Sequence, residues 1–155
     1  MRRLTIALLS IAAMLMLVAC GDVEGSGNGS FDGMWQLTQV DSVGKDITLD
    51  VRERQVFWSV QGNMLEMRDH LMENGDGHSP LLFRFEFVND TLHVTNPFIN
   101  YRREQDPSPT SPKATEFYGL NGLEEAFLVR QLSASKMVIE TCRQRDNIIL
   151  HFRKY

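Results

Sequence analysis

Residues 82–87 have the sequence Leu82-Phe83-Arg84-Phe85-Glu86-Phe87, in which aromatic and charged side chains alternate. In an extended strand, this period of two places the three phenylalanines on one face and the two charges on the other. The alternation therefore predicts a β-strand with one face in a core and one face in water.

Seven further segments show the same period and are separated by short turns. The eight predicted strands span residues 34–43, 56–60, 64–68, 83–88, 91–95, 126–132, 136–141 and 147–153, and residues 45–51 are a candidate ninth strand. Turns such as Gln61-Gly62-Asn63 and Asn89-Asp90 connect consecutive strands, as in antiparallel hairpins. No alternation of strands with long helices is present, so we expect an all-β, up-and-down antiparallel architecture.

Two segments depart from the strand pattern. Asn121 and Glu124 have the spacing of a capping box, which predicts one short helix over residues 122–127. Residues 97–120 form a long connection that contains four prolines, and connections of this length commonly serve as lids or binding loops. Aromatic residues flank this connection, so we expect its two ends to be packed and its centre, residues 106–113, to be exposed.

The N-terminal residues have a different composition from the rest of the chain. Arg2 and Arg3 precede an apolar run over 4–18, which is short for a membrane span and typical of a signal-peptide core. The run ends in Leu17-Val18-Ala19-Cys20, which resembles the lipobox of bacterial lipoproteins. The resemblance implies cleavage after Ala19 and acylation of Cys20. The alternative is an ordinary secretory signal followed by a chance cysteine.

Residues 20–30 follow as the lipidated cysteine and a tether rich in glycine and serine, whose root-mean-square reach is under about 20 Å. Gly21 stands where lipoproteins retained in the inner membrane carry aspartate, and this resemblance implies anchoring in the bacterial outer membrane. The sequence leaves open whether the protein faces the periplasm or the cell surface. We therefore divide the chain into a signal peptide (1–19), a lipidated tether (20–30) and a domain (31–155).

The length and net charge of the chain limit the number of domains and the classes of partner that we expect. The chain has 155 residues with 16 basic and 20 acidic side chains, so its formal net charge is −4. This length accommodates one ordinary domain. A nucleic-acid-binding protein needs a basic surface, and the acidic balance argues against that class of partner.

The opening of the predicted domain has the sequence Phe31-Asp32-Gly33-Met34-Trp35. It resembles the Gly-x-Trp signature of lipocalins, here Gly33 and Trp35, and the wider pattern is similar to that of bacterial lipocalin-like lipoproteins. The resemblance implies a closed barrel of about eight strands whose first and last strands are neighbours. It also implies that Trp35 plugs the closed end and that Arg153, near the end of the last strand, stacks on its ring.

The sequence contains no motif of nucleotide binding, hydrolysis or metal catalysis. His70 and His78 flank Glu73, Asn74 and Asp76, which could form a metal loop, but we expect a solvated hairpin loop instead. Cys142 lacks a disulfide partner once Cys20 is acylated, and we expect its thiol to be buried. We therefore expect no enzyme activity, no metal site and no cofactor.

Five aromatic side chains can face the interior of the predicted barrel: Trp58, Phe83, Phe85, Phe87 and Phe152. They would either line a cavity for a small hydrophobic ligand or fill the core, and both interpretations stay open. The first makes the protein a lipid-anchored binding protein, with residues 97–120 as a lid. The second makes it an interaction lipoprotein that acts on an envelope partner through its surface.

Overall fold

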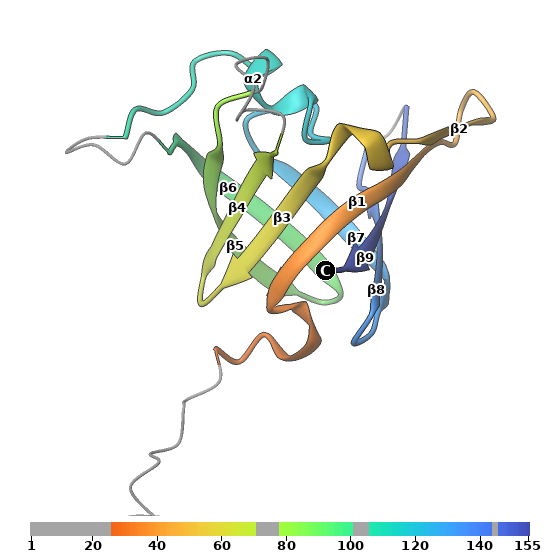
Figure 1. Cartoon of the computed structure of the whole chain (residues 1–155), viewed down its shortest axis with the longest axis horizontal. Helices are drawn as coiled ribbons and strands as arrows, with labels where there is room; N and C mark the ends of the chain where they lie inside the picture. Colours follow the sequence, from red (N-terminus) through yellow and green to blue (C-terminus); the bar gives the residue numbers. More distant parts are fainter. Residues whose placement is uncertain (1–25, 71–77, 101–105, 144–145) are drawn as a thin grey trace, which may run out of the picture.

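Strands β1 (Gly33–Ser42) and β9 (Ile148–Lys154) pair with each other, although they lie at opposite ends of the domain sequence. Every other neighbour in the barrel is also antiparallel, and the strand order β1-β3-β4-β5-β6-β7-β8-β9 is closed by the β1–β9 pair. The computed structural model describes residues 26–70, 78–100, 106–143 and 146–155 (Figure 1). The predicted closed, all-β antiparallel barrel of eight strands is confirmed.

The remaining strands follow the predicted order with small changes at their ends. They are β2 (Ile47–Asp50), β3 (Val56–Gln61), β4 (Met64–Asp69), β5 (Leu81–Val88), β6 (Thr91–Ile99), β7 (Glu125–Leu132) and β8 (Lys136–Thr141). Strand β2 pairs only with the far end of β1 and projects from the barrel as a hairpin. The candidate ninth strand is therefore present, outside the barrel.

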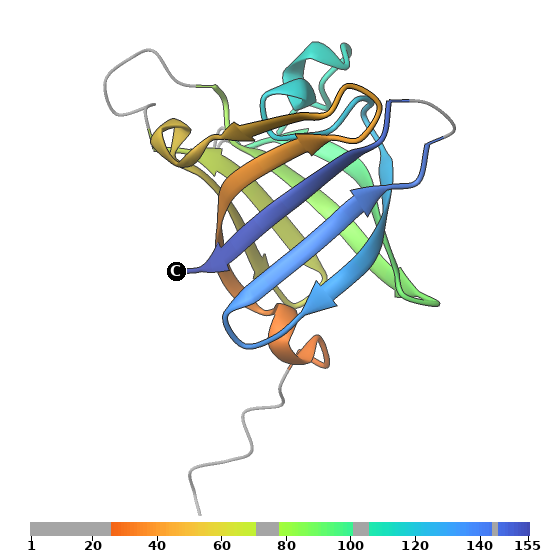
Figure 2. The ribbon, with the colours of Figure 1, turned by 90° about the vertical axis from the view of Figure 1, so that its right-hand side faces the viewer.

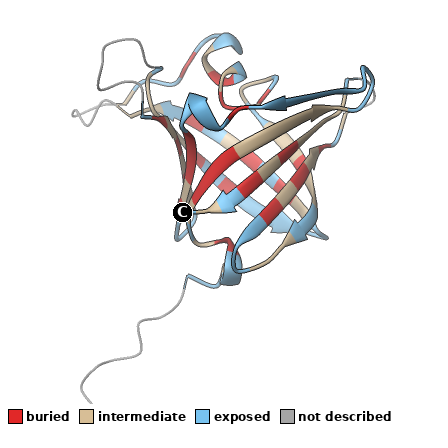
Figure 3. Ribbon diagram, turned by 45° about the vertical axis from the view of Figure 1, so that its right-hand side comes forward, coloured by how far each residue is buried: buried red, intermediate tan, exposed pale blue. Residues whose placement is uncertain are grey.

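Residues from the inward faces of the eight barrel strands form one continuous core, whereas all of β2 is exposed (Figure 3). In β4, for example, Leu65, Met67 and Asp69 are buried, whereas the residues between them are partly exposed. This pattern is the period of two that the sequence shows, now fixed by the register of the sheet.

Strand β6 is longer than predicted because it continues through Pro97 to Ile99. A proline interrupts a strand where its missing N–H would be needed, but a bulge removes that need. The pairing of β5 and β6 shifts between Leu82 and Arg84, opposite this position, and Asn96 has a φ of 51°. The irregularity therefore accommodates Pro97 within the sheet.

The helix predicted over 122–127 is wrong. Residues 125–127 belong to β7, where Glu125 pairs with Val94 and Phe127 pairs with Leu92. The short α-helix is instead α2 (Lys113–Glu116), a single turn within the long connection. A helix of two turns is marginal by itself, so the sheet pairing and burial of this segment outweigh its capping signal.

The two ends of the barrel differ (Figures 1 and 2). At one end, the 3-10 helix η1 (Gly29–Phe31) packs beneath the strands, next to the turns that connect β3 to β4, β5 to β6 and β7 to β8. We call this the closed end. At the other end, called the mouth, lie α2, the 3-10 helix η2 (Arg52–Arg54) and the β1–β2 hairpin. Among the described residues, no helix has the length and apolar character needed to cross a bilayer.

Candidate functional site

The closed end is sealed by residues that directly precede β1. Phe31 of η1 is fully buried, and the Trp35 indole Nε1 donates a hydrogen bond of 2.7 Å to its carbonyl oxygen. The Phe31 ring packs edge-on against Phe85 and Phe87, at centroid distances of 5.2 and 4.9 Å. Trp35 itself has no exposed surface, as predicted for a plug at this end.

The cation over Trp35 is Lys154, and the prediction of Arg153 is wrong. The Lys154 Nζ lies 4.3 Å from the centroid of the indole, in the range of a cation–π contact. Arg153 pairs with Gln36 in the register and donates to its side-chain oxygen on the outer surface. Phe152 points inward, so strand alternation turns Arg153 outward and Lys154 back toward Trp35.

Lys154 also fastens η1 to the last strand. Its Nζ donates to the carbonyl oxygens of Ser30, at 2.9 Å, and of Asp32. Gly33 lies beneath this side chain with a φ of 104°, and a Cβ there would lie 3.0 Å from Lys154 Cε. The glycine of the Gly-x-Trp signature is therefore needed for its backbone conformation, and a side chain there would also require Lys154 to shift.

Four of the five predicted interior aromatics are buried in the core: Trp58, Phe83, Phe85 and Phe152. Trp58 packs against Phe152 and Phe127, with centroid distances of 4.8 and 5.7 Å. The Trp58 indole Nε1 is buried and has no hydrogen-bond acceptor among the described residues. These rings pack on one another, as in the filled-core interpretation.

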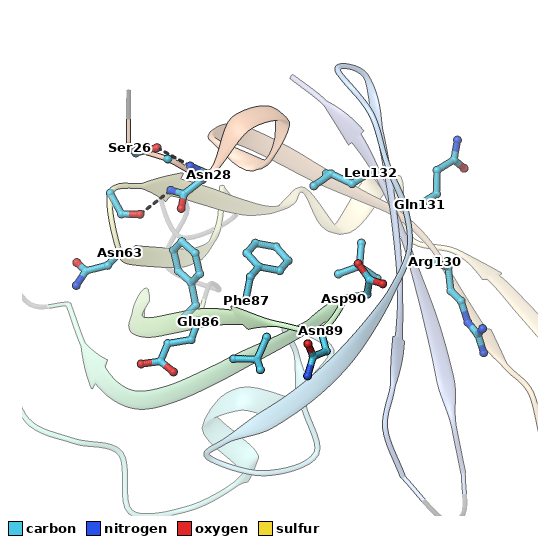
Figure 4. Close-up of a pocket in the computed structure, with 15 residues that line it drawn as sticks. Ser26, Asn28, Asn63, Glu86, Phe87, Asn89, Asp90, Arg130, Gln131 and Leu132 are labelled. Carbon is cyan, nitrogen blue, oxygen red and sulfur yellow. Dashed lines mark hydrogen bonds between the residues drawn. The ribbon is translucent and has the colours of Figure 1, made fainter. Parts of the chain in front are cut away.

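Phe87 was predicted to face the interior, but its side chain is 40% exposed. It shares a face with Phe83 and Phe85. However, it lies near the end of β5, past Arg84, which is the last residue of β5 that pairs with β4. It lines a groove of about 940 Å³ at the closed end (Figure 4). This closed-end groove is bounded by residues 26–28, 62–63, 85–90 and 129–132.

The mouth is covered by the segment that contains α2, which we call the lid segment (residues 112–121). Within it, Tyr118 and Thr115 are fully buried, and Leu120 is nearly so. The Tyr118 hydroxyl lies 3.0 and 3.2 Å from the carbonyl oxygens of Ser79 and His78 and donates to them. Burial and the nearby Asp69 carboxylate raise the pKa of this hydroxyl, so it remains a neutral donor.

The expectation for the long connection is confirmed in part. Its C-terminal end is packed, and most of residues 106–113 are exposed, although Pro109 is buried. Residues 101–105 lie outside the described residues. The Ile99 N–H donates to the Pro107 carbonyl, which fixes the connection to the end of β6.

A pocket of about 350 Å³ remains between the lid segment and the barrel wall, and we call it the mouth pocket. Its apolar wall is formed by Leu37, Val40, Leu49, Phe117, Leu120 and Ile148. Leu37 is almost fully buried and pairs with Phe152 across the β1–β9 ladder. The pocket therefore reaches down to the layer of packed rings, but neither Trp58 nor Phe83 lines it.

The polar rim of the mouth pocket has no dominant charge. It carries Lys45, Arg54 and Arg143 together with Glu116 and Asp146. The Arg143 Nε donates to Glu125 at 3.1 Å, so this cation is already neutralised within the protein. A neutral apolar molecule fits this combination of an apolar wall and a balanced rim.

The two histidines of the candidate metal loop have structural contacts. His78 Nδ1 lies 2.9 Å from Asp69 Oδ2, and its ring stacks on Phe117 with a centroid distance of 3.8 Å. His70 packs edge-on against Phe57. Glu73, Asn74 and Asp76 lie outside the described residues. Within the part of the chain that the structure describes, no three His, Cys, Asp or Glu side chains gather as metal ligands.

The thiol of Cys142 is exposed, and the prediction of a buried thiol is wrong. Cys142 follows the last residue of β8 and lies at the mouth, where its N–H donates to the Ala126 carbonyl oxygen. The candidate lipidation site, Cys20, lies outside the described residues.

Comparison with known proteins supports the fold. The family model described as a lipocalin-like domain matches residues 15–155. A lipocalin-like protein from Bacteroides uniformis is similar in structure, with a TM-score of 0.58 and 18% identity over 82% of this chain and 100% of that chain. An uncharacterized protein from Bacteroides eggerthii has a TM-score of 0.53 and 21% identity over 80% of this chain and 98% of that chain. No curated protein matches the sequence.

Proposed function

The chain belongs to the lipocalin-like domain family, and from this premise we propose that it is a lipid-anchored envelope protein that binds one small apolar molecule in the mouth of its barrel. The observation that carries this proposal is the mouth pocket. Its volume of about 350 Å³ lies within the range of small-molecule sites, roughly 300–1,000 Å³. Its inner wall includes the nearly buried Leu37, so a ligand there would contact apolar surface beside the core.

The position of the lid segment supports the same function. It supplies Phe117 and Leu120 to the pocket wall, and it is attached through the Tyr118 hydroxyl, which donates to Ser79, and the Phe117 ring, which stacks on His78. A ligand could therefore enter by displacement of this segment without opening the barrel ladders. None of the five rings predicted from the sequence lines the mouth pocket, and Phe85 and Phe87 line the closed-end groove instead.

The test is binding of a neutral apolar fluorophore, N-phenyl-1-naphthylamine, to the folded protein. Leu49 lines the mouth pocket, and Val88 lines the closed-end groove; each side chain is 47% exposed. Leu49→Asp should weaken binding about tenfold or more, because a carboxylate beside an apolar ligand must be desolvated. Val88→Asp is the matched control and should leave binding unchanged.

Two results would contradict the ligand proposal. Absence of any fluorophore binding to the folded protein would argue against an apolar site. A loss of binding in Val88→Asp, with Leu49→Asp unaffected, would move the site to the closed-end groove.

The anchor is supported by Leu17-Val18-Ala19-Cys20 after the apolar run 4–18. Several acyl chains hold a protein stably in a bilayer. In a bacterial host, Cys20→Ser should abolish acylation and leave an unprocessed precursor or a soluble product. Retention of this variant in carbonate-washed outer membranes, at the level of the native protein, would refute the anchor.

A second candidate function is that of an interaction lipoprotein. The observation that favours it is the β1–β2 hairpin, where Val43, Ile47 and Leu49 are exposed by 56, 45 and 47%. Exposed apolar side chains on an edge hairpin are a common feature of protein–protein contacts. In this case Leu49→Asp would abolish capture of an envelope protein, and the fluorophore would not bind.

A further inference from the structure

The closed-end groove exposes apolar side chains at the end of the barrel where the tether begins. Its floor contains Phe87 and Val88, whose side chains are 40 and 47% exposed. The Phe87 ring points into the groove between Asn28 and Leu132, whereas the Glu86 carboxylate and the Arg130 guanidinium point away (Figure 4). The groove therefore presents an apolar centre with a polar rim.

The tether enters the barrel at this groove. Ser26, Gly27 and Asn28 form part of its lining, and Asn28 Nδ2 donates to the Gly62 carbonyl oxygen at 2.6 Å and to Asp32 at 2.8 Å. These bonds join the tether to both the β3–β4 turn and the start of β1. These bonds therefore fix the point where the tether leaves the domain at the closed end of the barrel.

Only residues 21–25 separate Ser26 from Cys20. Even a fully extended chain of this length holds the lipid within about 20 Å of the groove. The mouth lies farther away, because the ten residues of β1 run from the closed end to the mouth over roughly 30 Å of strand.

We propose that the closed end lies against the bilayer, with Phe87 and Val88 in contact with lipid and the mouth opening away from the membrane. This proposal rests on the proposed lipid anchor at Cys20. Burial of apolar side chains in the membrane interface is favourable, and the rim amides of Asn28 and Asn63 suit the hydrated headgroup region. The mouth pocket then exchanges its ligand with the aqueous side rather than with the membrane that holds the anchor.

Apolar contact drives this docking, and charge does not. The groove lining carries Glu86, Asp90 and Arg130, and Arg130 already donates to Glu140 at 2.7 Å. No basic excess is available to attract anionic lipid. The contact should therefore persist when ionic strength is raised from about 0.1 M to about 1 M, which shortens the Debye length from about 10 to 3 Å.

The experiment uses the processed lipoprotein in phosphatidylcholine vesicles that contain a lipid with a nitroxide near the headgroup. A fluorescent maleimide is attached either to the native Cys142, exposed at the mouth, or to Val88→Cys in a Cys142→Ser background. We expect nitroxide quenching at position 88 to be at least threefold greater than at position 142. Phe87→Asn should reduce the quenching at position 88.

Equal quenching at the two positions, or stronger quenching at position 142, would overturn the inference. A label at position 88 shielded from both the nitroxide lipid and aqueous iodide would also overturn it, because a second copy or the protein's own tether would then fill the groove. Failure of the protein to float with vesicles would refute the anchor itself. Flotation with a reversed quenching pattern would leave the anchor intact and refute only the orientation.

Discussion

The closed end and the mouth of the barrel are covered by segments that differ in their position along the chain. At the closed end, η1 directly precedes β1 and is held by the Trp35 indole, the Lys154 ammonium and the Asn28 amide. At the mouth, the cover is a segment between β6 and β7, held by the Tyr118 hydroxyl and by stacking of Phe117 on His78. A cover inside a long connection can move while the barrel ladders stay intact, whereas η1 is joined directly to β1. We therefore expect substitutions at the closed end to have the larger effect on stability, and the proposed ligand to exchange at the mouth.

The largest expected effect is at the closed end, in Trp35→Ala. The indole has no exposed surface, so its removal should lower the free energy of unfolding by about 3–5 kcal/mol in urea denaturation. This is a large share of the roughly 5–15 kcal/mol that stabilises a domain.

The two facing tryptophans give a matched control for this effect. Trp35→Phe removes a donor that bonds to the Phe31 carbonyl, whereas Trp58→Phe removes a donor with no acceptor among the described residues. Trp35→Phe should therefore cost more, by about 1–3 kcal/mol. Equal losses would show that the plug is held by packing alone.

The next effect compares a glycine at each end. Gly119, in the lid segment, has a φ of 93°, and a Cβ there would lie 2.9 Å from the buried Leu150 side chain. Gly119→Ala should cost about 1–3 kcal/mol, through both the backbone strain and the overlap. Gly62 at the closed end has a φ of 59° and open space around it, so Gly62→Ala should cost only about 1 kcal/mol.

Amide hydrogen exchange shows whether Gly119→Ala affects only the lid segment or the whole barrel. Gly119→Ala should deprotect the Leu120 N–H, which bonds to Thr115, before it deprotects the strands. If protection falls equally in β1 and β9, the lid segment is not an independent cover.

A smaller effect separates the two cationic residues at the end of β9. Lys154→Met should lower the free energy of unfolding by about 1–2 kcal/mol, because it removes the contact with Trp35 and the bonds to Ser30 and Asp32. Arg153→Met, on the outer surface, should change it by at most about 0.5 kcal/mol. If Arg153→Met lowers the free energy of unfolding more than Lys154→Met does, Arg153 would be the residue that stacks on Trp35, as the sequence resemblance implied.

The smallest effect is the pH dependence of the tether contacts. Hydrogen bonds from Ser26 and Asn28 lower the pKa of the Asp32 carboxyl below its usual value of 3.8. A lowered pKa in the folded state means that the stabilisation is complete above pH 3.8 and is lost as the pH falls through the folded-state pKa. Protection of the Phe31 N–H, which bonds to Asn28, should therefore be flat from pH 7 to about 5 and decline below about 4. Asp32→Asn should remove this decline.

The strands were predictable from the sequence because their signal is local. The alternation in Leu82–Phe87 and the turns at Gly62 and Asn89 determine which face is buried and where each hairpin reverses. Closure between the first and last strands followed only from the resemblance, since no local pattern specifies a β1–β9 pair.

Other features depend on geometry that a sequence pattern does not encode. The position of Lys154 depends on the register of β9 against β1, which contains an irregularity between Leu37 and Gln39. Strand alternation with Phe152 inward was the available signal for Lys154, and it would have excluded Arg153. Phe87 shares the inward face but lies past the part of β5 that pairs with β4. Cys142 lies past the end of β8. The exposure of both residues therefore depends on where the strands end in space.

The mouth pocket was outside the reach of sequence reasoning, because its wall combines β1, β2, β9 and the lid segment. No spacing rule brings Leu37, Leu120 and Ile148 together. The long connection was the available signal, and it indicated a lid without indicating what the lid covers.

The most direct test of ligand binding at the mouth is a nuclear magnetic resonance titration of methyl-labelled protein with N-phenyl-1-naphthylamine. Methyl groups line both candidate sites: those of Leu37, Val40, Leu49, Leu120 and Ile148 in the mouth pocket, and those of Val88, Val129 and Leu132 in the closed-end groove. We predict saturable shifts in the first set and none in the second. Shifts confined to Val88, Val129 and Leu132, or no shifts in either set, would contradict the assignment of the mouth as the ligand site.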